Sequence, residues 1–524
     1  MRGPIDGFSI SSSHSEQVRT SYRGSLRGAS QFTSFPLGEG LLISQGCLSS
    51  QHMLDLAKRR WRQTMNVRPL HMGALLIILS LVIATVSCGR EAPLASTDGE
   101  TVSRVEGTIA KVCQLVGDFD RERNQSTVSL TYTRYGVAGT DLGVSFEHGQ
   151  KLVFLFGDTV GKNSMPFSGK DDSWAYTTDS VPDNGLELVF YTGAPGKFLP
   201  PAVPGVSQGP FEVPMEGVEI NGVAYVFFTT NHTEQRTMGR SVLARLDDES
   251  LSFTYLYSFS NDRFLNVQVA VINNSDFQSL PENNGRGLLI WGSGEYRKSD
   301  PYLAWMPYDA IENKSKLWYF KGTDANNSPL WSQDENDAVA LFHDPIIGEF
   351  SVFWNQYVNR WIMFYGGVSM RSAVLPWGPW SDRETVFDVA KEGYTKFIHW
   401  PGKDNLSDPL RESTPGGPYG PYVVEKFTKG SSGRSTVYFT LSTWNPYTAV
   451  LIKVGLMLRA AQRTETAAST SMRTVETAAT GQVTHPAETG TAVLRPSIVR
   501  LEIIAVIGFA IIVIMVALLR KRRT

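Results

Sequence analysis

One pattern recurs five times along the chain and limits the folds that it can adopt: a turn followed by a short apolar or aromatic run. The runs recur roughly every 63 to 76 residues, and each follows an earlier strand-like segment. They are Lys151 to Phe156, Val223 to Phe228, Gly287 to Trp291, Arg360 to Tyr365, and Thr436 to Leu441. Radial repetition of four-stranded sheets is typical of a β-propeller, whereas a large β-sandwich, the alternative, has no reason to repeat hairpins at this spacing. The sequence therefore predicts an all-β fold, a five-bladed β-propeller over residues 105–458.

The composition agrees with such a fold and excludes several classes of function. Aromatic residues make up 11% of the chain and charged residues 19%, with 47 glycines, a mixture typical of all-β domains with many turns and surfaces for stacking on sugars. The net charge of -2 provides no basic field to attract nucleic acid. Cys47, Cys88 and Cys113 lie at or before the start of the predicted domain, and His148 and His343 lack ligand partners at suitable spacing. We therefore expect neither a disulfide framework nor a metal site or other cofactor.

The N-terminal region reads as a targeting segment. Residues 1–64 are rich in Ser, Gly, Gln and Arg, which predicts disorder or a mis-assigned translation start. Basic residues then precede an apolar run, so residues 65–88 are predicted to be a signal peptide or N-terminal anchor, and the sequence before Cys88 leaves lipidation open as an alternative. A polar linker follows over residues 89–104. We expect Val105 to Tyr135 to pack on the propeller or to complete its last blade.

The C-terminal region reads as a stalk and a membrane anchor. Residues 459–497 are rich in Thr and Ala with no apolar period, which is typical of a spacer. Residues 498–524 contain an apolar stretch from Ile503 to Leu519 followed by Arg520-Lys521-Arg522-Arg523, which predicts a single transmembrane helix with a basic cytoplasmic tail. The sequence thus predicts a single-pass protein of the cell membrane with an extracellular propeller and a cytoplasmic C-terminus.

The first hairpin of the predicted propeller, Gly139 to Thr159, carries an aspartate at each open end. Asp141 precedes its first strand, and Asp158 follows the apolar run of its second strand. Two carboxyl groups at one end of a buried hairpin repel each other and are partly desolvated, so that one stays ionised while the other holds a proton, as hydrolysis requires. Taken alone, the pair has an alternative interpretation as turn-capping residues.

Several longer stretches resemble the domain of unknown function 4185 (DUF4185) family. The matching stretches cover most of residues 105–458 and read GTDLG, LFGDT, DSWAYTTD, LIWGSGEYRKSDPYLAW, GEFSVFWN, RWIMFYGG, PWGPWS, GGPYGPYV and STWNPY. The resemblance implies a five-bladed propeller like those of furanosidase-type glycoside hydrolases, and some relatives are endo-acting D-arabinanases. In such propellers the base aspartate typically starts the first inner strand, which is the kind of position that Asp141 occupies.

Four carboxylates are candidates for the catalytic acid and base. Asp141 and Asp158 come from the first hairpin, and the general acid on another blade is expected to be Glu216, before the second run, or Glu295, after the third. Arg297 lies near Glu295 and would lower its pKa if the two pair, which argues against an acid role for Glu295. The choice between these two glutamates stays open.

The candidate substrate-binding residues combine rings for stacking with polar groups. Aromatic rings offer apolar area with specific geometry, although most aromatic side chains in a propeller pack between blades. Asp179, which follows an aromatic stretch, has turn capping as its alternative. The set comprises Asp179, Trp291, Arg297, Tyr302, Trp444 and Asn445, and Tyr296 and Tyr447 are further candidates for stacking on a sugar ring.

These features together predict a surface-displayed glycoside hydrolase that acts on a furanose-containing, arabinan-like polysaccharide by carboxylate acid/base chemistry. The alternative is a non-catalytic glycan-binding or adhesion propeller, since a membrane anchor suits either role. The expected partners are a polysaccharide or glycan substrate and the membrane, through the C-terminal helix. We expect no nucleic acid partner, and we expect the chain to be a monomer.

Overall fold

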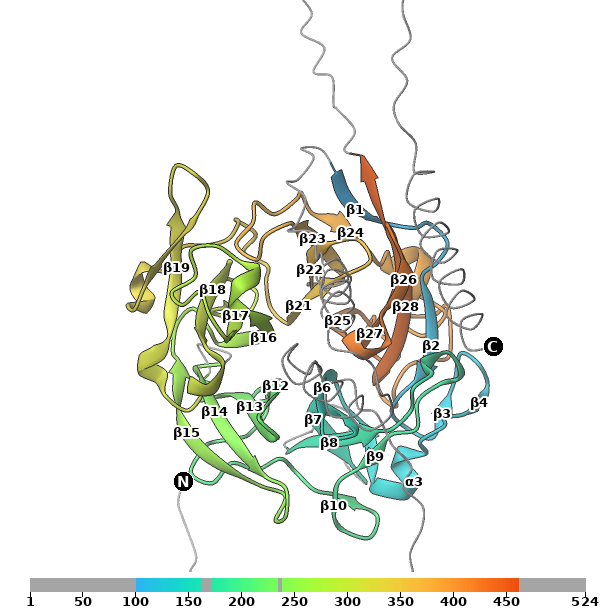
Figure 1. The fold of residues 1–524 in the computed structure, drawn as a ribbon. Helices are drawn as coiled ribbons and strands as arrows, with labels where there is room; N and C mark the ends of the chain where they lie inside the picture. The colour runs from blue at the N-terminus through green and yellow to red at the C-terminus, as the bar shows by residue number, and fades with distance from the viewer. Residues whose placement is uncertain (1–99, 163–170, 234–237, 461–524) are drawn as a thin grey trace, which may run out of the picture. The chain divides into compact units, whose positions relative to one another are not determined.

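Five β-sheets surround a common centre in the computed structural model, which describes residues 100–162, 171–233 and 238–460 (Figure 1). Each sheet is antiparallel and is a blade of a β-propeller. The prediction of an all-β, five-bladed propeller is confirmed.

The blades follow one another along the chain. Blade 1 consists of β6 (Leu142–His148), β7 (Lys151–Gly161), β8 (Asp171–Thr177) and β9 (Val189–Phe190), with β5 (Val137–Gly139) paired to the end of β7. Blade 2 consists of β12 (Pro214–Ile220), β13 (Val223–Thr230), β14 (Arg240–Asp247) and β15 (Ser252–Ser260). Blade 3 consists of β16 (Asn266–Asn273), β17 (Arg286–Ser293), β18 (Pro301–Pro307), β19 (Trp318–Thr323) and β20 (Pro329–Ser332). Blade 4 consists of β21 (Phe350–Asn355), β22 (Arg360–Tyr365), β23 (Ser369–Ala373) and β24 (Glu384–Thr385). Blade 5 consists of β25 (Pro418–Val423), β27 (Arg434–Trp444) and β28 (Tyr447–Ala460), with β26 (Lys429–Ser431) on β27 and with β1 (Glu100–Arg104) and β2 (Ala110–Gln114) on β28.

The remaining elements are short. Two small ribbons are formed by β3 (Phe119–Asp120) with β4 (Gln125–Ser126) and by β10 (Thr192–Ala194) with β11 (Lys197–Phe198). The helical turns are α3 (Thr131–Tyr135), the 3₁₀ turns η1 (Pro182–Asn184), η2 (Asn274–Asp276), η3 (Tyr308–Ala310), η4 (Lys314–Lys316), η5 (Glu335–Asp337) and η7 (Glu425–Phe427), and the π-helical turn η6 (Val389–Gly393).

The first strands of the blades form the inner ring. β6 contacts β12, β12 contacts β16, β16 contacts β21, β21 contacts β25, and β25 returns to β6. The five runs that recur in the sequence are the second strands, β7, β13, β17, β22 and β27, each paired with the inner strand of its own blade. The recurrence therefore marks a strand in each blade that is buried on both faces along most of its length.

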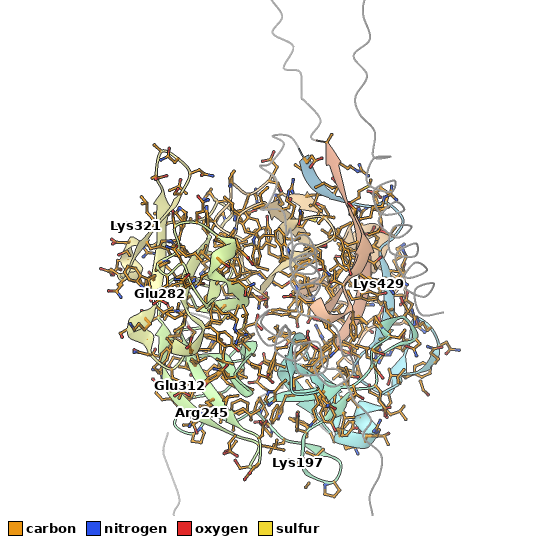
Figure 2. The ribbon with its side chains drawn as sticks, viewed as in Figure 1. Lys197, Arg245, Glu282, Glu312, Lys321 and Lys429 are labelled. Atoms are coloured by element: carbon orange, nitrogen blue, oxygen red, sulfur yellow. The ribbon has the colours of Figure 1, made fainter. Side chains whose placement is uncertain are left out.

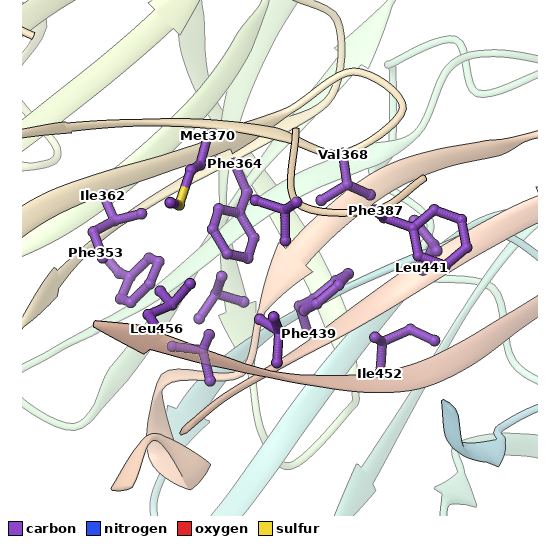
Figure 3. Close-up of a cluster of buried hydrophobic side chains, with 14 of the residues drawn as sticks. Phe353, Ile362, Phe364, Val368, Met370, Phe387, Phe439, Leu441, Ile452 and Leu456 are labelled. Atoms are coloured by element: carbon purple, nitrogen blue, oxygen red, sulfur yellow. The ribbon is translucent and has the colours of Figure 1, made fainter. Parts of the chain in front are cut away.

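The second strand of blade 4 shows why these runs are apolar throughout. Side chains alternate between the two faces of a strand, so Ile362 and Phe364 join the cluster shared with blade 5, while Trp361, Met363 and Tyr365 join the cluster shared with blade 3. Figure 3 shows the first of these clusters, in which Phe364 meets Phe439 of blade 5 edge to face, with ring centroids 5.4 Å apart. Each fully buried aliphatic or aromatic side chain contributes roughly 1.5–3 kcal/mol, so the seams between blades are the hydrophobic core of the domain.

The N-terminal strand closes the ring. β1 runs antiparallel to β28, with Glu100 opposite Ala460 and Arg104 opposite Leu456, and Figure 1 shows the two strands side by side. β2 pairs with the other half of β28. The segment expected to be a linker, residues 89–104, thus contains a strand of blade 5, and the two ends of the described chain are held in one sheet.

Arg245 and Glu312 are charged side chains on the outside of the blades (Figure 2). Arg245 of β14 contacts Glu312 at 3.1 Å, and the Tyr225 hydroxyl donates to the same carboxylate at 2.9 Å. The ion pair joins blade 2 to the turn that follows β18 of blade 3. Because both side chains are nearly half exposed, the ion pair contributes only about 0–1 kcal/mol, so packing rather than charge holds these blades together.

The predicted targeting and anchoring segments lie outside the described residues. These are the signal peptide or N-terminal anchor at residues 65–88, the stalk, apart from Arg459 and Ala460 at the end of β28, and the C-terminal helix. Within the part of the chain that the structure describes, no helix has the length and apolar character needed to cross a membrane.

Candidate active site

A cavity of about 340 Å³ is lined by residues in or beside β6, β7, β21, β25, β27 and β28 of blades 1, 4 and 5 and by the loops before β12, before β14 and after β17. Three carboxylates line it, Asp141, Asp158 and Glu349, together with the guanidinium group of Arg297. Several aromatic side chains complete the lining, namely Phe211, Tyr296, Tyr419, Trp444 and Tyr447. A pocket of this size with a few convergent polar groups is typical of a small-molecule or sugar site.

An irregular start to β6 presents Asp141 to this cavity. Leu142 pairs with Phe156 and Val144 pairs with Leu155, so Gly143 is an extra residue in the ladder. Both bulge residues have left-handed backbone conformations, with φ of 63° at Leu142 and 94° at Gly143. The second strand leaves room for the carboxyl group only because residue 157 is glycine: a Cβ atom there would lie 2.5 Å from Asp141 Oδ1.

The Asp141 carboxyl group is buried and only half satisfied. Its Oδ2 accepts a hydrogen bond from the Tyr419 hydroxyl at 2.8 Å, while its Oδ1 has no hydrogen-bond partner. Burial raises the pKa of Asp141 well above its ordinary value, and the negative charge of Asp158 raises it further. Asp141 therefore holds its proton at pH values where an exposed aspartate has lost it.

Asp158 lies in β7, at the same open end of the hairpin as Asp141, and is closer to solvent. Its carboxylate accepts from the backbone N–H of Phe211, at 3.0 Å to one oxygen and 3.3 Å to the other. Burial raises the pKa of Asp158 to about 6, against the opposing effects of the Phe211 N–H and of His232. The two carboxyl groups interact, and a proton shared by the pair lies preferentially on Asp141, whose pKa is raised by burial and by the charge of Asp158.

Glu349 brings a third carboxylate from blade 4. It immediately precedes β21, as Asp141 immediately precedes β6. Its Oε1 accepts from the Tyr296 hydroxyl at 2.7 Å, and its Oε2 lies 3.6 Å from Arg297 Nη2. The sequence analysis included this residue in the stretch GEFSVFWN but did not identify it as a site residue. The signal that would have found it is a carboxylate directly before an inner strand.

The two glutamates expected to supply the general acid lie elsewhere. Glu216 is buried in β12, where its carboxylate accepts from the N–H groups of Gly217 at 2.8 Å and Val269 at 3.4 Å. Glu295 contacts Lys298 at 2.8 Å and lines a separate, open depression with Tyr302. Neither glutamate lines the cavity that contains Asp141.

Of the six predicted substrate-binding residues, Arg297 and Trp444 line the cavity and the others do not. Trp291 is fully buried and packs against Trp361 with ring centroids 5.1 Å apart. The Asp179 carboxylate accepts from the Glu187 N–H at 2.8 Å, which is a loop-holding role.

Asn445 and Tyr302 also have structural surroundings. The Asn445 side chain is buried and accepts from the Asp408 N–H while donating to the carbonyl groups of Arg411 and Thr414. Tyr302 packs beside Phe264, with ring centroids 6.3 Å apart.

Two aromatic side chains of the cavity were missed entirely. Phe211 is 51% exposed in the loop before β12, and its N–H binds Asp158. Tyr419 is buried at the start of β25 and binds Asp141. Tyr419 lies in the family stretch GGPYGPYV, but only the closing of the ring brings it to a residue 278 positions earlier.

Chemically, the arrangement offers one protonated and one ionised carboxyl group in a shared cavity, which is the requirement for general acid and general base catalysis. Among the described residues, no group of three or more His, Cys, Asp or Glu side chains is arranged to hold a metal ion.

Solved structures similar to this chain include an exo-β-1,3-galactanase, a GH43_1 enzyme and a protein of unknown function. An exo-β-1,3-galactanase from Phanerochaete chrysosporium, solved with β-1,3-galactotriose, is 11% identical to this chain with a TM-score of 0.32. The match covers 66% of this chain and 64% of the galactanase, so this chain spans less than two thirds of that protein. A GH43_1 enzyme from Xanthomonas citri is 11% identical with a TM-score of 0.32, covering 60% of this chain and 86% of that one. A protein of unknown function from Dyadobacter fermentans is 10% identical with a TM-score of 0.29, covering 67% of this chain and all of that one.

No curated protein matches this sequence. A family assignment is nevertheless possible, because a match to one family extends over residues 127–453, from the segment before α3 to the middle of β28. The chain belongs to the family described as Domain of unknown function (DUF4185).

Proposed function

We propose that the protein is a glycoside hydrolase that cleaves a furanose-containing, arabinan-like polysaccharide through Asp141 and Asp158. The observation that carries this proposal is the pair itself: two carboxyl groups from one hairpin line one cavity, and the charge of Asp158 raises the pKa of Asp141. Glycoside hydrolysis needs such a pair, with one group protonated and the other ionised. A module that only binds sugar has no need to bury two carboxyl groups together.

The electrostatics favour Asp141 as the acid and Asp158 as the base. Asp141 keeps its proton to a higher pH than Asp158, whose pKa is about 6. In the proposed reaction Asp141 donates its proton to the glycosidic oxygen as the bond to the anomeric carbon breaks. Asp158 accepts a proton from the water that attacks that carbon. This assignment reverses the one implied by the position of Asp141 at the start of the first inner strand.

Glu349 is proposed as a positioning residue for this pair. Burial and Asp158 are the main causes of the raised pKa of Asp141, and the charge of Glu349 adds to them. The Tyr296 hydroxyl donates to the Glu349 carboxylate at 2.7 Å and Arg297 lies 3.6 Å from it, so both hold this carboxylate in place. A fixed negative charge beside the pair helps Asp141 to keep its proton until the substrate arrives.

The lining favours a neutral sugar. With Asp141 protonated, the carboxylates of Asp158 and Glu349 still outnumber the one guanidinium group, and the resulting negative charge opposes a uronic acid or a phosphorylated sugar. Trp444, Phe211 and Tyr419 supply apolar area for the carbon-bound faces of a sugar ring. The preference for arabinan is drawn from the arabinanases within the family that the chain resembles.

A polysaccharide screen tests the proposal. The purified protein is incubated with arabinan, galactan and xylan, and new reducing ends are measured. We expect release from arabinan by the wild type and none by Asp141→Asn or Asp158→Asn, and neither substitution should lower the unfolding midpoint. Binding of these polymers without turnover would contradict the proposal in favour of a glycan-binding or adhesion propeller.

We further propose that the propeller is displayed outside the cell on the stalk that precedes the C-terminal helix. Removal of the residues after Gln462 is expected to release active protein into the soluble fraction. If the shortened protein stays with the membrane, the anchor lies instead in the N-terminal segment or at a lipidated Cys88.

A further inference from the structure

A second cavity, of about 310 Å³, lies beside the first. Tyr447 lines both cavities. The chain also passes from one to the other within four residues, because Ala138 lines the second cavity and Asp141 lines the first. The two cavities are therefore neighbours on the seam between blades 1 and 5.

The wall between the cavities is held from both sides. The Tyr447 hydroxyl donates to the carbonyl oxygen of Asp158 at 2.8 Å, and the Tyr447 N–H donates to Asp408 Oδ2 at 2.7 Å. A Cβ atom at Gly139 would lie 2.5 Å from the Tyr447 carbonyl oxygen, so the backbone of β5 packs directly on this residue. A rigid wall of this kind keeps both cavities open at a fixed separation.

The second cavity has an aromatic surface exposed to solvent. Phe119 of β3 is 48% exposed and Tyr132 of α3 is 39% exposed, and both line the cavity. The ammonium group of Lys162 lies 5.4 Å from the Tyr132 ring centroid, so one face of that ring is occupied. Phe119 is the main platform on which a sugar ring can stack.

The positively charged groups of the second cavity already have acceptors within the protein. Lys111 contacts Asp120 at 2.7 Å and Glu122 at 2.8 Å, and its side chain is only 4% exposed. Arg121 donates to the carbonyl oxygens of Leu406 and Ser407. Because these cations are engaged with protein acceptors, the cavity does not select an anion. Carboxylate oxygens of Glu122 and Asp408, both partly exposed, are acceptors for hydroxyl groups.

We propose that the second cavity is a binding subsite for a neutral glycan, which holds residues of the polysaccharide away from the bond that is cleaved. The proposal rests on the proposed function, since it assigns to one substrate the two cavities on either side of Tyr447. Its consequence is a preference for long chains: a polymer occupies both cavities, whereas a small glycoside fills only the cavity of Asp141.

The test uses the full-length chain, purified in detergent, with Phe119→Ala and Tyr132→Ala. The matched control is Tyr255→Ala, because Tyr255 is also 39% exposed but lies on β15 of blade 2 and lines neither cavity. The substrates are linear arabinan and para-nitrophenyl arabinofuranoside. We expect Phe119→Ala to raise KM for arabinan about three- to tenfold, with a smaller rise for Tyr132→Ala, and to leave KM for the small glycoside unchanged. Tyr255→Ala should change neither constant.

Two outcomes separate the subsite from the catalytic assignment. If arabinan is hydrolysed with the same KM by Phe119→Ala and the wild type, the proposal of a subsite is wrong and the proposal of a hydrolase is unaffected. If no glycoside is hydrolysed, the proposal of a hydrolase is wrong, and the proposal of a subsite is then tested by retardation in a native gel that contains arabinan. Weaker retardation of Phe119→Ala than of Tyr255→Ala supports the subsite. Equal retardation of the two variants overturns it. Phe119→Leu, which keeps the apolar volume without the ring, replaces Phe119→Ala if the latter lowers the unfolding midpoint.

Discussion

Asp141 and Glu216 form an instructive pair, because both are buried carboxyl groups at the inner strands of neighbouring blades and burial raises the pKa of each well above its ordinary value. They differ in their partners. Both Glu216 oxygens accept from backbone N–H groups, one of them from Val269 of the next blade. Asp141 has one oxygen without a partner, a second carboxyl group nearby and a cavity in front of it. A raised pKa thus indicates burial, and only the combination with an unpaired oxygen and a cavity indicates chemistry.

The largest expected effect is the difference in activity between variants at these two positions. Asp141→Asn and Asp158→Asn should each lower kcat about 10²- to 10⁴-fold on arabinan, because each removes one proton-transfer group. Glu216→Gln, which keeps one of the two acceptor oxygens and lies outside the cavity, should change kcat by no more than a few-fold. Initial rates of reducing-end release measure all three. If kcat fell as far in Glu216→Gln as in Asp141→Asn, the two carboxyl groups would not differ in function as described.

The next effect is a gain of stability on removing Asp158. In the unfolded chain its carboxyl group ionises near its ordinary pKa of 3.8, and in the native protein near 6. At pH values below both pKa values the carboxyl group is protonated in the native and in the unfolded state and does not change the free energy of unfolding. As the pH rises from 3.8 to 6, the unfolded state releases its proton first, so the native state loses stability. Asp158→Asn should therefore raise the free energy of unfolding at neutral pH by up to about 3 kcal/mol.

Urea unfolding at neutral pH and at about pH 4 measures this gain, which should fall towards zero at the acidic pH. Equal stabilisation at both pH values would show that the carboxyl group is not the cause.

Removal of the charge on Glu349 should have a smaller effect, on the pH profile. The charge of Glu349 adds to the raised pKa of Asp141, after burial and Asp158. Glu349→Gln should therefore lower the pKa of the proposed acid, and the decline of kcat/KM at high pH should move to lower pH by up to about one unit. Glu295→Gln is the matched control, since Glu295 contacts Lys298 outside the cavity. A profile shifted equally by both variants would argue against a role for Glu349 beside the pair.

The smallest expected effect has the opposite sign. The hydrogen bond from the Tyr419 hydroxyl lowers the pKa of Asp141, although burial and Asp158 outweigh it. Tyr419→Phe should raise the pKa of Asp141 and move the high-pH decline to higher pH by a few tenths of a unit. The same pH–rate measurement that is used for Glu349→Gln detects it. A shift to lower pH would mean that Tyr419 does not donate to the ionised carboxylate.

The fold was predictable from the sequence because the second strand of each blade is buried on both faces. That burial requires continuous apolar runs, and five runs at regular spacing imply five blades. The strand β1 was not predictable, since only Val102 of its five residues is fully buried and its structure comes from pairing with β28 at the far end of the chain.

The candidate site was predictable only where its residues are local. Asp141 and Asp158 come from one hairpin, so their proximity follows from turn geometry. Glu349 and Tyr419 reach the cavity from blades 4 and 5, through ring closure that no local pattern encodes. Trp291 could not be told from a stacking residue, because a ring buried between blades and a ring facing a sugar occupy strands of the same composition.

The most direct test of the account is the activity of Asp141→Asn on substrates with different leaving groups. An acid is needed when the departing oxygen is a poor leaving group, as in arabinan, and is largely dispensable when it belongs to para-nitrophenol. The account predicts that Asp141→Asn loses its activity on arabinan but retains most of it on para-nitrophenyl arabinofuranoside, while Asp158→Asn loses both. An equal loss of both activities in Asp141→Asn would contradict the assignment of Asp141 as the residue that gives up its proton.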